Sequence, residues 1–224
     1  VFETTLARKL GSPASIFLCL GNISRKRKLI ECSAETFACI RIEAEKRAFR
    51  NAGGLDSSVS LDSIYREVGF ALRLPEPMLR EIKELEIQLE VRLLTSIPFV
   101  EDLIIQARQQ GSKVIFVSDM YLDNTFIQER LAQFNLWQRE DRLYLSRDCQ
   151  KSKSSGKLYQ LVLEKEKALA KDVVHNGNHI WSDVGSARKI GLKVRPFVDG
   201  NLNRYEEILE SHSWISGGLS SAMA

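Results

Sequence analysis

The sequence predicts an α/β protein with a doubly wound parallel sheet and an inserted helical segment. Two observations lead to this prediction. In the second half of the chain, short apolar runs that end at turn-forming residues alternate with stretches of helical periodicity. Between about residues 24 and 110, apolar residues recur only at helical spacing. Strands that alternate with helices indicate βαβ units, so we expect a Rossmann-like core with an α-helical cap.

The expected strands are short apolar runs of the kind buried in parallel sheets. Val1 and Phe2 are the end of a first strand, and further strands are expected at residues 113–117, 142–145, 172–175 and 193–197. Helices are expected behind Asp123, as a helix cap, behind Ser155, and from Ser182 to Gly191. The cap would therefore be inserted between the first and second strands.

Helical stripes in the middle of the chain define the expected cap. They cover residues 37–48, 64–72 and 82–93, and they end near glycine or proline residues. A further helix over 99–110 leads back to the sheet. We therefore expect a core formed by residues 1–20 and 99–224 and a cap formed by residues 21–98.

Composition limits the classes of function. The chain has 224 residues, 44% hydrophobic and 27% charged, and a formal net charge of +3. No apolar run approaches the roughly 20 residues of a membrane span, and so small a charge demands no nucleic-acid partner. Four cysteines without CxxC spacing indicate no disulfide framework, which favours the cytoplasm. Because the chain opens at Val1 inside an apolar stretch, we expect neighbouring domains in a longer polypeptide.

Polar residues follow the expected strands at the edge where parallel sheets bind ligands. Ser118 follows the second strand, Lys153 lies in the loop after the third, and Asn178 and Asp183 follow the fourth in a Gly-Asn-x4-Asp loop. Each feature alone is commonplace. Their order, with a helical insertion after strand one, resembles the haloacid dehalogenase (HAD) superfamily of hydrolases.

The resemblance covers nearly all of the chain. It is strongest to the branch whose first motif reads Phe-Asp-x-Phe-Asp-Thr-Leu and which often occurs beside glycosyltransferase domains. It implies Mg²⁺-dependent hydrolysis of a phosphorylated small molecule through an aspartyl-phosphate. Alignment of residues 1–4 on that motif puts the nucleophilic aspartate directly before Val1.

The resemblance also implies roles for individual residues. Ser118 would donate its hydroxyl to a phosphoryl oxygen, and Lys153 would neutralise charge on phosphate and nucleophile. Independently of the resemblance, Asp119 follows Ser118 directly and is expected either to contact substrate or to hydrogen-bond its loop. The Phe2 carbonyl, Asn178 and Asp183 would face the Mg²⁺.

Two residues depart from the family's phosphatases. Phe2 stands where they have an acid/base aspartate, and Glu3 is the nearest substitute for proton transfer. Asn178 stands where many relatives have aspartate, which weakens a Mg²⁺ site. Two alternatives therefore remain: a catalytically silent module that binds a ligand or supports other domains, and dehalogenase-like hydrolysis at carbon.

Overall fold

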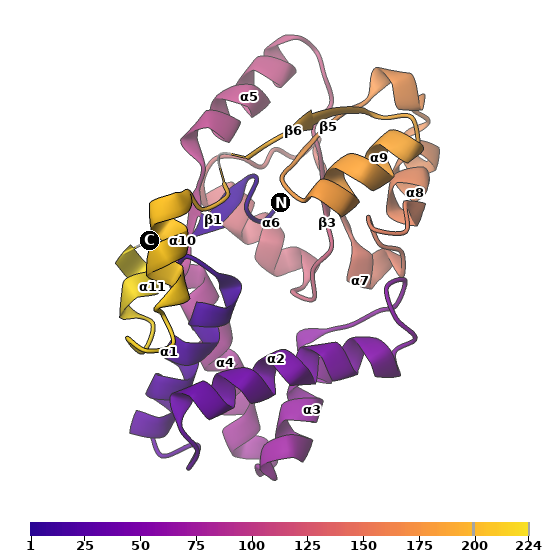
Figure 1. Cartoon of the computed structure of the whole chain (residues 1–224). Helices are drawn as coiled ribbons and strands as arrows, with labels where there is room; N and C mark the ends of the chain where they lie inside the picture. The colour runs from indigo at the N-terminus through magenta and orange to yellow at the C-terminus, as the bar shows by residue number, and fades with distance from the viewer. Residues whose placement is uncertain (199, 224) are drawn as a thin grey trace. The chain divides into compact units, whose positions relative to one another are not determined.

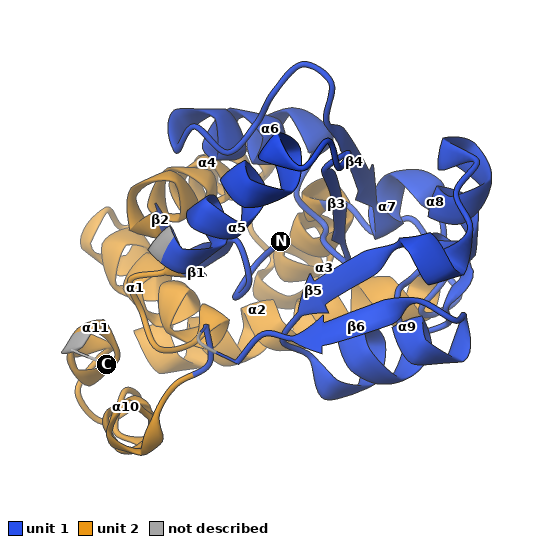
Figure 2. Ribbon diagram, turned by 90° about the horizontal axis from the view of Figure 1, so that it is seen from above, with its two compact units in different colours: residues 1–7, 52–60, 95–201 blue, residues 8–51, 61–94, 202–224 orange. Residues whose placement is uncertain are grey.

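The computed structural model describes residues 1–198 and 200–223, and the chain forms two compact units (Figures 1 and 2). Unit 1 consists of residues 1–7, 52–60 and 95–201, and unit 2 of residues 8–51, 61–94 and 202–224. These bounds differ from the expected core and cap. Residues 8–20 and 202–224, expected in the core, lie in unit 2, and residues 52–60 of the expected cap lie in unit 1.

Unit 1 contains two pairs of parallel strands, as Figure 2 shows. Strand β3 (Ile115–Ser118) pairs with β4 (Arg142–Leu145), and β5 (Val174–Gly177) pairs with β6 (Lys193–Pro196). These four strands and the α/β class were predicted, and the structure confirms them, with two strands displaced by about two residues. The expected continuous sheet is instead divided, since β3–β4 and β5–β6 form separate sheets.

Helices connect these strands. Unit 1 contains α5 (Pro98–Gln109), α6 (Asn124–Gln133), α7 (Ser146–Cys149), α8 (Lys157–Glu166) and α9 (Ser186–Lys189). Asp123 caps α6 as predicted, because its carboxylate accepts the N–H of Phe126 at 2.7 Å. The helix expected from Ser182 to Gly191 is shorter, since a π-helical turn over Ile180–Gly185 precedes α9.

Unit 2 is helical. It contains α1 (Pro13–Lys26), α2 (Ala34–Asn51), α3 (Leu61–Leu72), α4 (Glu76–Leu93), α10 (Arg204–Ser211) and α11 (Leu219–Met223). Helix α1 was not predicted, and it runs across the expected boundary at residue 20. The core of unit 2 encloses a fully buried Arg41, which donates to Glu86 Oε1 at 2.7 Å and Oε2 at 2.9 Å.

The sequence also did not predict two short strands that pair with each other. Strand β1 (Leu6–Arg8) pairs with β2 (Leu94–Ser96), and both lie where the chain passes from one unit into the other. Over residues 1–198 and 200–223, no helix combines the length and apolarity needed to cross a membrane.

Candidate active site

A buried ion pair is the centre of the candidate site in unit 1. Lys153 is 8% exposed and Asp183 is 2% exposed, and the Lys153 Nζ donates to Asp183 Oδ1 at 2.6 Å. His175 Nε2 lies 3.0 Å from the same oxygen. Tyr159 donates its hydroxyl to the Ser182 carbonyl at 2.9 Å and lies 3.1 Å from His175 Nε2. The loops that follow β4 and β5 therefore meet at one carboxylate.

A glycine explains how Asp183 reaches this position. A Cβ at Gly177, the last residue of β5, would lie 2.5 Å from the Cβ of Asp183, so a larger residue would displace the carboxylate. The other oxygen of the side chain, Asp183 Oδ2, accepts the backbone N–H of His179 at 3.1 Å. The Gly-Asn-x4-Asp spacing thus has a packing reason, since the chain turns back and lays Asp183 against the glycine.

The pKa values of this cluster follow from burial and charge. Burial favours the neutral acid of Asp183, but the hydrogen bond from His175 and the charge of Lys153 hold the pKa of Asp183 well below its usual range. Burial lowers the pKa of His175, against the pull of Asp183. At neutral pH the imidazole is therefore uncharged and the Asp183 carboxylate is ionised, 2.6 Å from the Lys153 Nζ.

The end of β3 positions the lysine loop. Ser118 is the last residue of β3 and is 3% exposed. Asp119, the next residue, is exposed, and its two carboxylate oxygens accept the backbone N–H of Lys153 at 2.9 and 3.1 Å. Asp119 therefore bonds the loop that carries Lys153, whereas the expected bond was within its own loop.

The start of the chain approaches the same loops. Phe2 is 7% exposed, Glu3 has a left-handed backbone with a φ of 53°, and the Thr4 hydroxyl lies 3.3 Å from the Asn178 Oδ1. The α-amino group of Val1 is buried, and burial together with the charge of Lys153 lowers its pKa to about 5. The Val1 amino group therefore lies within electrostatic range of the Lys153–Asp183 pair.

A residue that the sequence did not single out holds the lysine loop from the other side. Asp56 accepts the N–H of Ser152 at 2.9 Å and the hydroxyl of Ser155 at 2.6 Å, and it pairs with the Lys157 ammonium at 2.7 Å. Asp56 is far from these partners in sequence and stands in a Gly-rich turn, so only the folded chain reveals the contact. Asp119 thus bonds the backbone of Lys153, and Asp56 bonds its neighbours Ser152 and Ser155.

Among the described residues, the carboxylate expected to face Mg²⁺ already has other partners. Asp183 Oδ1 is shared by Lys153 and His175, and Asp183 Oδ2 accepts a backbone N–H. Asn178 offers a neutral amide, whereas Mg²⁺ sites in proteins usually include one or two carboxylates. Within the described part of the chain, no group of three or more His, Cys, Asp or Glu side chains is arranged to hold a metal.

The structure therefore divides the predicted site residues into two contacting sets. One joins Asp119, Lys153 and Asp183, and the other joins the segment after Val1 to Asn178 through Thr4. Ser118 is placed beside the first set by its bond to Asp119 along the chain. His175, expected to be packed or hydrogen-bonded, is bonded to Asp183.

Comparison with known proteins identifies the fold. No protein-family model matches the chain, and no curated protein matches it. Among solved structures, the 2-haloacid dehalogenase of Pseudomonas syringae pv. tomato DC3000 is similar at a TM-score of 0.61 and 13% identity, over 84% of this chain and 80% of the other.

Two further solved structures have different descriptions. A Thermotoga maritima protein assigned as a β-phosphoglucomutase has a TM-score of 0.52 and 18% identity, over 80% of this chain and 83% of the other. A Bacillus subtilis protein assigned as a HAD hydrolase and bound to magnesium has a TM-score of 0.58 and 16% identity, over 87% and 84%. The α/β core with helical insertions in this chain is therefore the fold that these solved structures share.

Proposed function

We propose that this chain is the hydrolase part of a longer protein and acts on small anionic molecules through a covalent ester. The ester would form on an aspartate directly before Val1. The observation that carries the proposal is the buried ammonium of Lys153, held 2.6 Å from Asp183 Oδ1 where the loops after β4 and β5 meet. A fixed, desolvated cation beside the start of the chain can orient an anionic substrate and a carboxylate nucleophile.

The charges of the cluster favour a substrate whose leaving group needs no proton. Lys153 is balanced by Asp183, and His175 is neutral, so these three groups have little surplus positive charge for a phosphate dianion. Phe2 cannot protonate a leaving group. Halide leaves a carbon atom as an anion without a proton. Hydrolysis at carbon, as in the dehalogenases that share this fold, is therefore the reaction that the geometry supports best.

Hydrolysis of the carbon–halogen bond needs water as its only co-reactant. A carboxylate oxygen attacks the carbon that bears the halogen, a C–O bond forms, and the halide departs with the electron pair of the C–X bond. Water then adds to the ester carbonyl, the alcohol leaves, and the carboxylate is regenerated with one oxygen from water and release of a proton to solvent. Lys153 would hold the anionic group of the substrate, and Asp183 would hold Lys153.

A Mg²⁺-dependent phosphatase is the second candidate, as the motif resemblance implies. Asn178 Oδ1 and the Phe2 carbonyl are oxygen ligands of the kind that Mg²⁺ accepts, and an aspartate before Val1 would add a carboxylate. Ser118 and Lys153 would then bind the phosphoryl oxygens of a phosphorylated small molecule. One solved structure of the same fold is bound to magnesium, which supports a magnesium-dependent reaction as the second candidate.

The test uses the chain extended at its start, with aspartate or, as a matched control, asparagine directly before Val1. Halide release from 2-haloacids and phosphate release from a phosphoester panel are measured with EDTA and with added Mg²⁺. We expect halide release in EDTA, lost with asparagine and with Lys153→Ala, and retained with Lys151→Ala in the same loop. Phosphate release that requires Mg²⁺ would replace the first candidate by the second.

The silent-module alternative predicts no turnover in either assay. The same result with aspartate before Val1 would therefore overturn both enzymatic candidates. Unfolding measurements on each variant show whether a loss of activity comes from the site or from a loss of the fold. The control Lys151→Ala should leave both the activity and the free energy of unfolding unchanged.

A further inference from the structure

One end of unit 2 has a concentrated positive charge. The last turn of α1 and the residues that follow it form a run of four exposed basic residues, Arg25, Lys26, Arg27 and Lys28. Arg27 pairs with Glu81 of α4 at 3.2 Å. Among residues 1–198 and 200–223, the other three basic residues of the run form no ion pair. The run therefore has positive charge that no carboxylate of the described chain neutralises.

The ion pair places this run beside the turn that joins α3 to α4. The last turn of α3 packs on the first turn of α4, because a Cβ at Gly69 would lie 2.8 Å from Leu79 Cδ2. Leu79 is two residues from Glu81, the partner of the basic run. Figure 1 shows the ends of α1 and α3 and the start of α4 at one end of unit 2. We call residues 25–28 and 66–81 at this end the basic tip.

The charge of the basic tip exceeds that of the whole chain. Its two segments contain seven basic and three acidic residues, a formal charge of +4, whereas the 224 residues together have +3. One of the three acidic residues, Glu81, is bonded to Arg27. An anionic surface is therefore attracted to this end of unit 2, over the distance of roughly 10 Å at which salt leaves such charges effective.

An exposed aromatic ring lies among these charges. Phe70, in the last turn of α3, is 80% exposed. Arg66 lies one helical turn before it, Arg73 directly follows the helix, and both are exposed. Met78, in the first turn of α4, is 37% exposed. Apolar side chains surrounded by Lys and Arg are the composition of protein surfaces that bind the headgroup region of anionic membranes.

We propose that the basic tip is a docking surface for a membrane that contains anionic lipids. Phe70 and Met78 enter the headgroup region, and the surrounding Lys and Arg side chains bind the anionic groups of the lipids. Nucleic acid has the same sign of charge, but the residues between Phe70 and Met78 favour lipid. Pro75 and Pro77 are exposed there, and like Met78 they have neither an aromatic ring that stacks on a base nor a side-chain hydrogen-bond donor.

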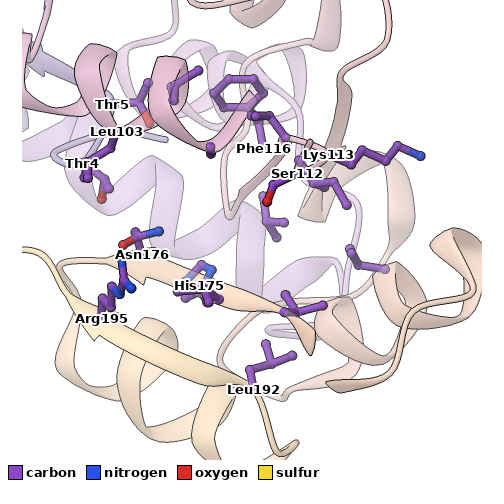
Figure 3. Close-up of a pocket in the computed structure, with 18 of the residues that line it drawn as sticks. Thr4, Thr5, Leu103, Ser112, Lys113, Phe116, His175, Asn176, Leu192 and Arg195 are labelled. Atoms are coloured by element: carbon purple, nitrogen blue, oxygen red, sulfur yellow. The ribbon is translucent and has the colours of Figure 1, made fainter. Parts of the chain in front are cut away.

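Membrane docking goes beyond the proposed function, since the basic tip shares no residue with the candidate active site. It also shares none with the cavity of about 560 Å³ that His175 lines, because the residues that line this cavity belong to unit 1 (Figure 3). Docking and hydrolysis can therefore be tested separately.

Co-sedimentation of the chain with lipid vesicles tests the proposal. One set of vesicles is phosphatidylcholine alone, and the other contains about one third phosphatidylserine. We expect binding to the anionic vesicles only, and added salt should weaken it because salt screens exposed charges. Arg25→Gln, Lys26→Gln and Lys28→Gln combined should weaken this binding about a hundredfold, since each Lys or Arg near an anionic surface strengthens it about fivefold.

Two matched controls separate the basic tip from general effects of charge and apolarity. Lys165→Gln, Lys171→Gln and Lys189→Gln combined remove the same charge from exposed residues of unit 1, and they should weaken binding by less than about threefold. Phe70→Gln should weaken binding on the order of fivefold. Tyr205→Gln changes an aromatic residue of α10 that is 79% exposed, and it should leave binding unchanged.

The proposal is overturned if the chain does not bind the anionic vesicles, or if the two triple variants weaken binding equally. Binding to an RNA or DNA oligonucleotide without binding to vesicles would also overturn it and would assign the basic tip to nucleic acid. Self-association that Phe70→Gln abolishes, measured by sedimentation of the chain without lipid and accompanied by no vesicle binding, would overturn it in favour of a second copy of the chain.

Discussion

Removal of the Asp183 charge should destabilise the fold far more than a surface substitution does. In Asp183→Asn the Lys153 ammonium remains buried without its carboxylate, and the side chains of this pair are 11% and 3% exposed. Breaking a buried ion pair by removing one partner costs about 3–5 kcal/mol, because the remaining charge is uncompensated. We therefore expect a loss of about this size in the free energy of unfolding, measured by urea denaturation at pH 7.

A double-mutant cycle shows whether the cost comes from the stranded charge. In a Lys153→Met background the Asp183 carboxylate is itself a buried charge without its partner, so Asp183→Asn removes that charge and should cost less than about 1 kcal/mol or stabilise the fold. The coupling between the two sites should then be about 2 kcal/mol or more. If Asp183→Asn costs the same in both backgrounds, with coupling below about 0.5 kcal/mol, the buried pair has been assigned the wrong role.

Three further predictions concern other buried or bridging groups. Glu86→Gln should cost about 3–5 kcal/mol in urea unfolding, since both side chains of its pair with Arg41 are fully buried, and a cost below about 1 kcal/mol would contradict this. The pKa of His175 is lower in the folded chain than in the unfolded chain, so the unfolded chain takes up the proton at a higher pH. The free energy of unfolding should therefore fall as the pH drops below about 6.5. Measured against pH, this fall should be smaller in His175→Gln. Asp56→Asn should cost less than about 1 kcal/mol because the site is partly exposed, yet speed hydrogen exchange at the Ser152 amide, and an unchanged exchange rate would exclude the bridging role.

The strands were predictable because a buried strand has a recognisable local sequence pattern. Runs such as residues 113–117 are apolar at successive positions, and this pattern identifies buried strands without knowledge of their neighbours. Which strands pair with each other is not visible in such a pattern. The division into two strand pairs depends on tertiary packing, which the pattern of either strand does not report.

Helix α1 and the buried charges of unit 2 were missed for different reasons. Ser12 and Pro13 are ordinary start signals for α1, but the continuous apolar run from Ile16 to Leu20 hides the helical period. The helical stripes over residues 37–48 and 82–93 did not single out Arg41 or Glu86. They pair with each other across 45 residues of sequence, and only tertiary contact makes their burial favourable.

The candidate site was predictable in its residues but not in its bonding. The order of Ser118, Lys153, Asn178 and Asp183 along the chain indicates their shared edge of the core. It does not indicate that Asp183 is saturated by Lys153, His175 and a backbone N–H. Those bonds are made by residues far apart in the sequence, so its pattern does not report them.

The most direct test of the proposed function follows the oxygen atom of water. The chain with aspartate directly before Val1 is allowed to turn over a 2-haloacid in heavy-oxygen water, and the peptide that contains this aspartate is analysed by mass spectrometry. Attack of water on an ester carbonyl predicts that the heavy oxygen enters the aspartate carboxylate. Turnover with the heavy oxygen found only in the product, and none in the aspartate, would contradict the covalent ester.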